Sequence, residues 1–367
     1  NQGRAKYQLL HLSDIPRQLR RYLKPDVAMI TVSGPDNGGN YSLGTTVEAV
    51  PAAVESVKQN EGVVIAERNA RMPFVLGGTI PGEMIDYLVD TDYPLPTSPV
   101  KPPDEAARRI GQIIARNFVQ DGTTLQYGIG QVPEAVTDAI LAKGVRDLGI
   151  HTELFADAMQ RLVEAGVVTN RHTFIHVNCA MSSIFLSSDQ EGYDWLDYNS
   201  SVQSRPCDYT NSVLNIAREP NMVAINGAIG VDLHGNIWAD SLQARRIYSG
   251  VGGQSDFLRG AALSPGGVPI IALRSTTEKG ISKIVEKCPE GITTTAIAAD
   301  QVVIVTEHGA FDPWGLSFSE RVVAIAHLAE PETRHQLLKQ IYDSPVYHHP
   351  AQALKDRVPK GIIPLNF

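Results

Sequence analysis

The chain has 367 residues, of which 43% are hydrophobic and 20% are charged. These values are ordinary for a folded protein with a sizeable core, and they exclude a disordered chain, a coiled coil and a collagen-like fibre. The formal net charge is −8, and no local basic patch offsets it, so we expect no nucleic-acid binding. The longest apolar runs are only as long as strands, so we expect no membrane span.

The three cysteines, Cys179, Cys207 and Cys288, form neither a CxxC pair nor a disulfide framework. The first residues contain no apolar signal sequence. Both features indicate a reducing, cytoplasmic location. The ten histidines are dispersed and show no metal-ligand spacing, so we expect no metal.

Two short apolar runs, 27–32 and 63–67, are the first predicted strands. The segment 93–104, YPLPTSPVKPPD, contains five prolines and predicts a stiff, extended connector. We therefore expect a first domain at 1–95 and a second domain at 96–343.

After the connector, amphipathic helical patterns alternate with further apolar runs. Helices are predicted at 104–119, at 152–165, from the capping-box pair Ser317 and Glu320, and from Pro331. Runs without polar alternation suit strands that are covered on both faces of a parallel sheet. The alternation predicts an α/β fold. These further runs are 123–127, 173–177, 222–226, 269–273 and 302–306.

The last residues, 344–367, are rich in proline and end on apolar side chains. We expect this tail to cover a surface of the protein or of a neighbouring subunit.

Two glycine clusters are the most informative local features. Glycine lets the backbone come close to a ligand and direct N–H groups at an anion or an oxyanion, although tight loop geometry alone also explains such clusters. Dinucleotide, phosphate-loop, zinc-hydrolase and nucleophile-elbow motifs do not occur in the sequence. The candidate binding residues are Gly128 and Gly130 in the first cluster and Gly250, Gly252, Gly253 and Gln254 in the second.

Four stretches resemble the acetyl-CoA hydrolase/transferase family, which includes the 4-hydroxybutyrate and acetate CoA-transferases. Together they cover nearly the whole chain in the family's order. The resemblance implies two related open-sheet α/β halves of the CoA-transferase (NagB/RpiA-like) type, with the active site between them and the first half incomplete at its N-terminus. The stretches are VSGPDNGGNYSLG at 32–44, GTTLQYGIGQVPEAV through DLGIHTE at 122–153, MVAINGAIGVDLHGNIWADS and RIYSGVGGQSDFLRGA within 222–261, and IALRSTT at 271–277 with TEHGA and GLSFSER within 306–321.

The resemblance implies an acyl-CoA:carboxylate CoA-transferase or an acyl-CoA hydrolase that acts on a short-chain acyl-CoA thioester. Coenzyme A enters as part of the substrate, and small carboxylates are the acceptors. In the transferases a glutamate attacks the thioester, which gives a mixed anhydride and then a glutamyl-CoA thioester. A homo-oligomer, or a complementary N-terminal segment or subunit, is the expected assembly. The alternative is a non-catalytic CoA-binding homologue or a subunit of a heteromeric CoA-transferase.

The resemblance places the family's nucleophilic glutamate in a stretch like INSAIEVDLTGQ. The stretch reads INGAIGVDLHGN here, with Gly230 at that position, and glycine cannot form a glutamyl-CoA. The replacements that we consider are Glu153, Asp232 and the pair Glu307 and His308. We prefer Glu307 and His308 because they follow a predicted strand at its carboxyl end and because histidine suits a general base. Glu153 equally suits a helix N-terminus, and Asp232 suits a turn.

Overall fold

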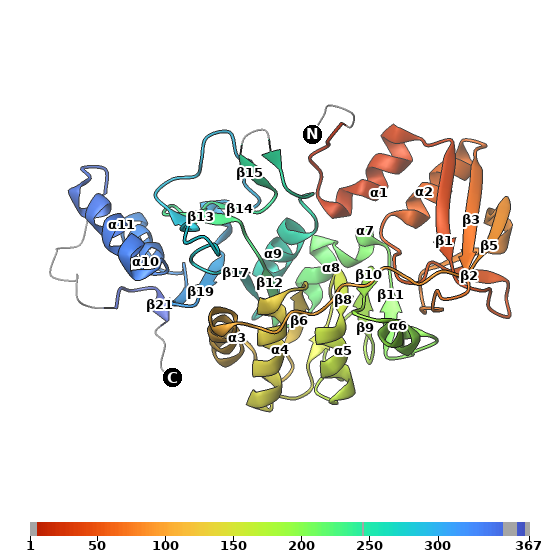
Figure 1. Cartoon of the computed structure of the whole chain (residues 1–367), viewed down its shortest axis with the longest axis horizontal. Coiled ribbons are helices and arrows are strands. Elements are labelled where there is room, and N and C mark those ends of the chain that lie inside the picture. The colour runs from red at the N-terminus through yellow and green to blue at the C-terminus, as the bar shows by residue number, and fades with distance from the viewer. Residues whose placement is uncertain (1–5, 244–245, 348–357, 364–367) are drawn as a thin grey trace.

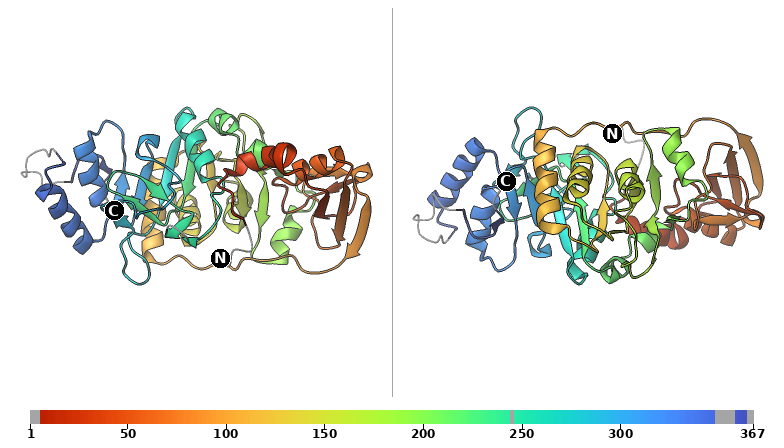
Figure 2. Two further views of the ribbon diagram at one scale, coloured as in Figure 1. Left: turned by 90° about the horizontal axis from the view of Figure 1, so that it is seen from above. Right: turned by 90° about the horizontal axis from the view of Figure 1, so that it is seen from below.

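The computed structural model describes residues 6–243, 246–347 and 358–363. The molecule is elongated, with the N-terminal strands at one end, the helices α10 (Phe318–Ala326) and α11 (Pro331–Asp343) at the other, and a large sheet between them (Figure 1). Views from above and below show the same order along the long axis (Figure 2). No helix within the described residues is long and apolar enough to cross a membrane.

A parallel sheet of order β1-β3-β5 forms the N-terminal end. Its strands are β1 (Val27–Val32), β3 (Val63–Asn69) and β5 (Tyr87–Thr91). Helix α2 (Val50–Gln59) packs on one face of this sheet, where the inward side chains of β1 and β3 form a core with it. The smaller elements of this end are η1 (Leu12–Asp14), α1 (Ile15–Gln18), η2 (Leu19–Leu23), β2 (Asn40–Ser42), β4 (Thr79–Pro81) and η3 (Gly82–Met84).

The other face of the β1-β3-β5 sheet is open and apolar. Alternate residues of a strand point to opposite faces, and the register aligns Met29, Ile65 and Tyr87 in one row. Met29 is 82% exposed and Tyr87 is 63% exposed. Parallel sheets are normally covered on both faces, so this face is unusual.

The proline-rich connector joins this end to the rest of the chain, as Figure 1 shows. It contains no helix or strand between β5 and α3 (Glu105–Phe118). The connector is nonetheless fixed to the second part of the chain, because Ser98 donates its N–H to the carbonyl of Ser187 and the Tyr193 hydroxyl donates to the carbonyl of Pro96. The prediction of an extended connector is confirmed.

The central sheet has seven strands in the order β21-β20-β19-β17-β12-β6-β7. The five strands from β19 to β7 are parallel to one another. At one edge, β20 pairs antiparallel with β19, and β21 pairs antiparallel with β20. The bounds are β6 (Thr124–Tyr127), β7 (Gly149–Ile150), β12 (Met222–Asn226), β17 (Val268–Ala272), β19 (Val303–Thr306), β20 (Gly309–Phe311) and β21 (Ile362–Ile363).

Helices cover both faces of the central sheet. Ile270 of β17 belongs to the core formed with α3, α4 (Gln131–Lys143) and α5 (Asp157–Glu164). The next residue, Ile271, belongs to the core on the opposite face, which includes residues of α9 (Gln254–Leu263), α10 and α11. This double cover explains why the strands carry no polar alternation.

The remaining elements are short strands and short helices. Three two-stranded sheets are present: β8 (Leu154–Ala156) pairs with β10 (Ile184–Leu186), β9 (Ala180–Ser182) pairs with β11 (Val202–Ser204), and β15 (Ser241–Gln243) pairs with β16 (Arg246–Ile247). A further small sheet contains β13 (Gly230–Asp232), β14 (Ile237–Trp238) and β18 (Ile284–Val285). The other helices are α6 (Gln190–Leu196), α7 (Cys207–Thr210), α8 (Val213–Arg218) and η4 (Ala298–Asp300).

Most predicted elements are confirmed, and two predictions are wrong. Residues 154–156 of the predicted helix 152–165 form β8, because this stretch pairs with β10. Residues 173–177 form bends and a turn instead of a strand. The carboxylate of Glu219 accepts the N–H groups of Phe174 and Ile175 there, so this backbone is satisfied without a neighbouring strand.

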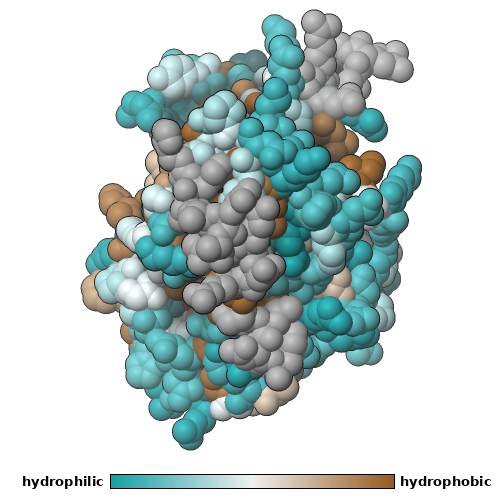
Figure 3. All heavy atoms as spheres, turned by 90° about the vertical axis from the view of Figure 1, so that its left-hand side faces the viewer, coloured by the Kyte–Doolittle hydropathy of each residue, from teal (hydrophilic) through white to brown (hydrophobic). Residues whose placement is uncertain are grey.

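The C-terminal end of the molecule is mostly hydrophilic where it is described, with apolar residues scattered over it (Figure 3). Helix α11 follows this pattern, since only Leu337 and Ile341 of its side chains are buried. Much of the expected tail at 344–367 lies outside the described residues, but β21 within it pairs with β20.

Candidate active site

A cleft of about 520 Å³ opens at the carboxyl ends of β6, β12 and β17. Strands β6 and β12 are neighbours, but the chain leaves β6 for β7 on one side and returns to β12 on the other. Ligands of open α/β sheets bind at such a topological switch point. Gln126 and Asn226, on these neighbouring strands, line the cleft and hydrogen-bond to each other, with the Asn226 Nδ2 atom 3.0 Å from Gln126 Oε1.

The first predicted glycine turn lies on this cleft. Gly128 and Gly130 both line it, and Gly130 is the N-cap residue of α4. Gly130 has φ of +112°, and a Cβ at either glycine would meet no other atom within 4 Å. These glycines therefore leave open space next to the free N–H groups of a helix N-terminus.

The second predicted glycine turn faces the first across the cleft. Gly252 and Gly253 line it, and Gly253 is the N-cap residue of α9. Gln254 also lines the cleft; its Nε2 atom donates to the carbonyl of Gly227 at 2.6 Å, while its buried Oε1 atom has no hydrogen-bond partner among the described residues. Gly250 does not line the cleft.

Glu153 places a carboxylate beside the second turn. It lies between β7 and β8, and its side chain lines the cleft. Its Oε2 atom accepts a hydrogen bond of 2.8 Å from Asn211 Nδ2. The pKa of Glu153 is raised above its usual range, because burial and the charge of Asp256 together outweigh the hydrogen bonds from Asn211 and the Gly253 N–H. The carboxylate is thus desolvated yet held by two directional donors.

Two further carboxyl groups, which the sequence did not point to, lie near Glu153. Glu48 reaches it from the N-terminal end, and burial followed by the charge of Glu153 raises the pKa of Glu48 to about 7. Asp256, in the first turn of α9, is buried and accepts hydrogen bonds from the N–H and hydroxyl of Ser13. Burial raises the pKa of Asp256. Asn211 was also missed, because no motif distinguishes it.

Two cationic side chains line the same cleft. Arg274 follows β17 and pairs with Asp104 at 2.6 Å. Lys283 makes no ion pair among the described residues, and burial and the nearby charge of Arg274 lower its pKa. A second cavity of about 470 Å³ shares both residues with the cleft and adds Lys279 and the acidic Glu278. The cleft of this acidic chain therefore contains one cationic side chain that makes no ion pair among the described residues, that of Lys283.

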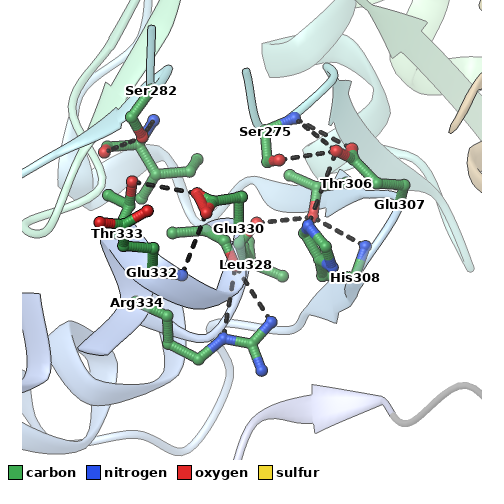
Figure 4. Close-up of polar contacts among 12 residues, drawn as sticks. Ser275, Ser282, Thr306, Glu307, His308, Leu328, Glu330, Glu332, Thr333 and Arg334 are labelled. Carbon is green, nitrogen blue, oxygen red and sulfur yellow. Dashed lines mark hydrogen bonds and ion pairs between the residues drawn. The ribbon is translucent and has the colours of Figure 1, made fainter. Parts of the chain in front are cut away.

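The preferred pair from the sequence, Glu307 and His308, does not line the cleft. Figure 4 shows the Glu307 carboxylate pointing at Ser275, which it binds through the backbone N–H at 2.9 Å and the hydroxyl at 2.6 Å. His308 follows it, and burial lowers the pKa of this imidazole. Glu307 therefore braces the loop that carries Arg274.

The other two positions considered from the sequence are structural. The Asp232 carboxylate accepts the N–H groups of His234, Asn236 and Cys288, as in a capped turn. Gly230 is buried in β13 and does not line the cleft, and a Cβ at this position would lie 2.2 Å from the Trp238 ring. The structure therefore offers no room at position 230 for a nucleophilic side chain.

No group of three or more histidine, cysteine or acidic side chains among the described residues is arranged to hold a metal ion. The chemical groups of the cleft are instead a carboxylate, backbone N–H groups and two cations.

Comparisons with known proteins identify the family. The chain is 37% identical over 345 residues to the 4-hydroxybutyrate coenzyme A transferase of Clostridium kluyveri (strain ATCC 8527 / DSM 555 / NBRC 12016 / NCIMB 10680 / K1), a match that covers 93% of this chain and 78% of the relative. The chain belongs to the acetyl-CoA hydrolase/transferase family. The family's N-terminal domain model matches residues 1–98, and its C-terminal domain model matches residues 189–341.

Other members of the acetyl-CoA hydrolase/transferase family agree with this placement. The succinyl-CoA:acetate/propanoyl-CoA:succinate CoA transferase of Fasciola hepatica is 37% identical over 348 residues, which is 93% of this chain and 71% of that protein. The crystal structure of 4-hydroxybutyrate CoA-transferase from Porphyromonas gingivalis superposes with a TM-score of 0.79 at 32% identity, over 91% of this chain and 79% of that one. The fold is thus the expected α/β fold of the CoA-transferase type.

Proposed function

We propose that this protein transfers coenzyme A between a short-chain acyl-CoA and a small carboxylate, with Glu153 as the nucleophile. The observation that carries the proposal is the position of the Glu153 carboxylate. It lies in the cleft at the switch point, held by Asn211 and by the N–H of Gly253.

The proposed reaction begins when a Glu153 oxygen attacks the thioester carbonyl. The C–S bond breaks, and the products are a mixed anhydride and the coenzyme A thiolate. The thiolate then attacks the Glu153 carbonyl carbon, which releases the first carboxylate and leaves a glutamyl-CoA thioester. An acceptor carboxylate reverses these steps and leaves as the new acyl-CoA. Covalent catalysis of this kind divides one difficult displacement into easier ones.

The glycine turns would stabilise the oxyanion that forms in each attack. Gly253 and Gly130 are N-cap residues of α9 and α4, and both line the cleft. Free N–H groups at a helix N-terminus favour a developing negative charge. Removal of one such donor typically costs about 3 kcal/mol of transition-state stabilisation.

The cations support an anionic substrate. Lys283 has no ion-pair partner among the described residues and lines the cleft together with Arg274. The adjoining cavity adds Lys279. We infer that the phosphates of coenzyme A bind on this side, so that the pantetheine arm reaches past the turn at Gly252 and Gly253 towards Glu153.

Hydrolysis of the acyl-CoA is the second candidate reaction, because water can take the place of the acceptor carboxylate. The non-catalytic alternative rested on the absence of a nucleophile at Gly230. The carboxylate of Glu153 removes that reason, so we favour an enzyme.

The direct test is to incubate the purified protein with acetyl-, propionyl-, butyryl- and succinyl-CoA, each with and without a labelled carboxylate. Label that enters the thioester identifies a transferase, and thiol release without acceptor identifies a hydrolase. Borohydride or hydroxylamine trapping followed by mass spectrometry should modify Glu153. If none of these thioesters is consumed, the enzyme proposal is wrong.

A matched pair of variants tests the assignment of the nucleophile. Glu153→Gln should lower turnover about 10³-fold or more, as loss of a nucleophile does in other covalent enzymes. Glu307→Gln should cause a much smaller loss, because Glu307 binds the loop at Ser275 outside the cleft. If Glu307→Gln lowered turnover more than Glu153→Gln, the catalytic role would belong to Glu307 and His308.

The domain division at 1–95, 96–343 and 344–367 stays a proposal, as does a cytoplasmic location, which the three free cysteines support.

We also propose that a segment from outside these residues, one that completes the first half, covers the open face of the β1-β3-β5 sheet. Two relatives support this proposal, because the match with this chain covers only 71% and 78% of their lengths. The alternative is that a second copy of this chain covers the face. Light scattering distinguishes the two, since a concentration-dependent dimer that Met29→Lys abolishes would favour the second copy.

A further inference from the structure

The loop that precedes α2 carries an acidic side chain, Glu48, close to Glu153. Residues 45–48 run along the segment 183–185, with Val47 donating its N–H to the carbonyl of Ser183 and Phe185 donating to the carbonyl of Thr45. The same segment binds Glu153, because the N–H groups of Ser183 and Ile184 both donate to the Glu153 carbonyl. Glu48 and Glu153 therefore flank one short segment.

Ser183 connects the two acidic residues directly. Its hydroxyl lies 2.9 Å from Glu48 Oε1 and 3.2 Å from the Glu153 carbonyl oxygen. The backbone of Glu48 is fixed as well, since its carbonyl accepts the N–H of Cys207 at 3.0 Å. A change at Glu48 can thus reach Glu153 through a single side chain.

Glu48 has a backbone conformation that glutamate rarely adopts. Its φ is +40°, in the left-handed region where a non-glycine residue costs about 1–3 kcal/mol. Such residues persist where surrounding contacts fix them, and they are frequent at active sites. The contacts of Glu48 with Ser183 and Cys207 supply that fixation here.

The groups that face the Glu48 carboxyl offer it no positive charge. They are Glu153, which carries a carboxylate, and the hydroxyl of Ser183 and the thiol of Cys207, which are neutral. Among the described residues, Glu48 makes no ion pair. Burial and the charge of Glu153 together raise the pKa of Glu48 to about 7.

We propose that Glu48 is a positioning residue for Glu153. Its neutral carboxyl group, anchored by Ser183, leaves Glu153 as the single negative charge of this pair and holds it against Gly253. Its ionised form repels the Glu153 carboxylate and any anionic substrate beside it. This inference rests on the proposed role of Glu153 as nucleophile.

The proposal predicts how turnover depends on pH. When the ionised form of Glu48 is inactive, kcat/KM falls about tenfold per pH unit once the pH exceeds the pKa of Glu48. The wild-type profile should therefore descend above pH 7. Glu48→Gln keeps an acceptor oxygen for Ser183 but cannot ionise, so this descending limb should vanish while activity at pH 6 is retained.

Two further variants complete the test. Glu83→Gln changes an exposed glutamate of the same end of the molecule and should leave the wild-type profile intact. Ser183→Ala removes a hydrogen bond that lowers the pKa of Glu48, so the descending limb should move to higher pH. This second shift keeps the proposal testable if Glu48→Gln fails to fold.

The experiment is the pH profile of acetyl-CoA consumption and carboxylate exchange from pH 5.5 to 9 for the four proteins. Loss of the limb in Glu48→Gln, or its upward shift in Ser183→Ala, supports the inference. Active variants with an unchanged descending limb overturn the inference alone. Absence of turnover in the wild type at every pH overturns the proposed function, and this inference with it.

Discussion

At the scale of single residues, the site depends on the absence of a side chain at Gly253. A Cβ there would lie 1.9 Å from Glu153 Oε2 and 2.1 Å from Asn211 Nδ2. Glycine at this position therefore lets the start of α9 approach the carboxylate, which neither the motif nor its spacing could show.

We expect Gly253→Ala to lower turnover by about 10²-fold or more, because it displaces Glu153 from Asn211 and removes an N–H from its place beside the carboxylate. Steady-state kinetics with acetyl-CoA measures the loss. Gly250→Ala is the control, since a Cβ at Gly250 meets only one atom, at 4.0 Å, and this residue does not line the cleft. Equal losses in the two variants would contradict the argument.

Gly230 shows the opposite case, in which a glycine inside a family motif serves packing. We expect Gly230→Ala to lower the free energy of unfolding by about 1–3 kcal/mol, because the added methyl group overlaps the Trp238 ring. Urea denaturation measures this change. The kcat of the folded variant should stay near that of the wild type, and Gly230→Glu should not increase turnover. An increase would restore position 230 as a nucleophile site.

At the scale of elements, local signals predicted the helices with clear starts. Asp104 caps α3 by accepting the Ala107 N–H at 2.9 Å, and Ser317 with Glu320 forms the predicted capping box of α10. Leu154–Ala156 has an equally apolar pattern but joins a strand pair. Pairing with residues distant in sequence therefore determined the secondary structure of this segment.

Asp104 connects element stability to the cleft, because it also pairs with Arg274 at 2.6 Å. We expect Asp104→Ala to lower the free energy of unfolding by about 1 kcal/mol through loss of the N-cap and also to raise the KM for acyl-CoA by freeing Arg274. Asp189→Ala is the matched control, since Asp189 caps α6 through the Gly192 N–H without lining the cleft. A control with the same KM change would exclude the Arg274 explanation.

At the scale of the whole molecule, buried carboxyl groups link folding to pH. In the folded state burial raises the pKa of Glu48 to about 7, above its ordinary value of 4.5. The folded protein therefore holds a proton that the unfolded chain releases between these pH values. The contribution of Glu48 to stability falls as the pH rises through this window and is constant above it.

The variant Glu48→Gln should separate the pH-dependent contribution of Glu48 to the free energy of unfolding from that of the histidines. We expect the stability of the variant relative to the wild type to increase between pH 5 and pH 8, because only the wild type has to ionise a buried carboxyl. Urea denaturation at four pH values measures the difference. A difference that does not change with pH would show that Glu48 ionises freely in the folded protein.

The sequence by itself determined the α/β class, most of the central strands, the helices with clear caps and both glycine turns, because these features depend on local pattern and backbone geometry. Only the tertiary structure decided which acidic residue reaches the cleft. Glu307 and Glu153 both follow strands of the central sheet, but Glu307 turns to Ser275 while Glu153 meets Gly253 and Asn211. Glu48 approaches Glu153 from the loop between β2 and α2. Tertiary packing determines where a side chain points and which residues distant in sequence it contacts. A single stretch of sequence does not contain this information.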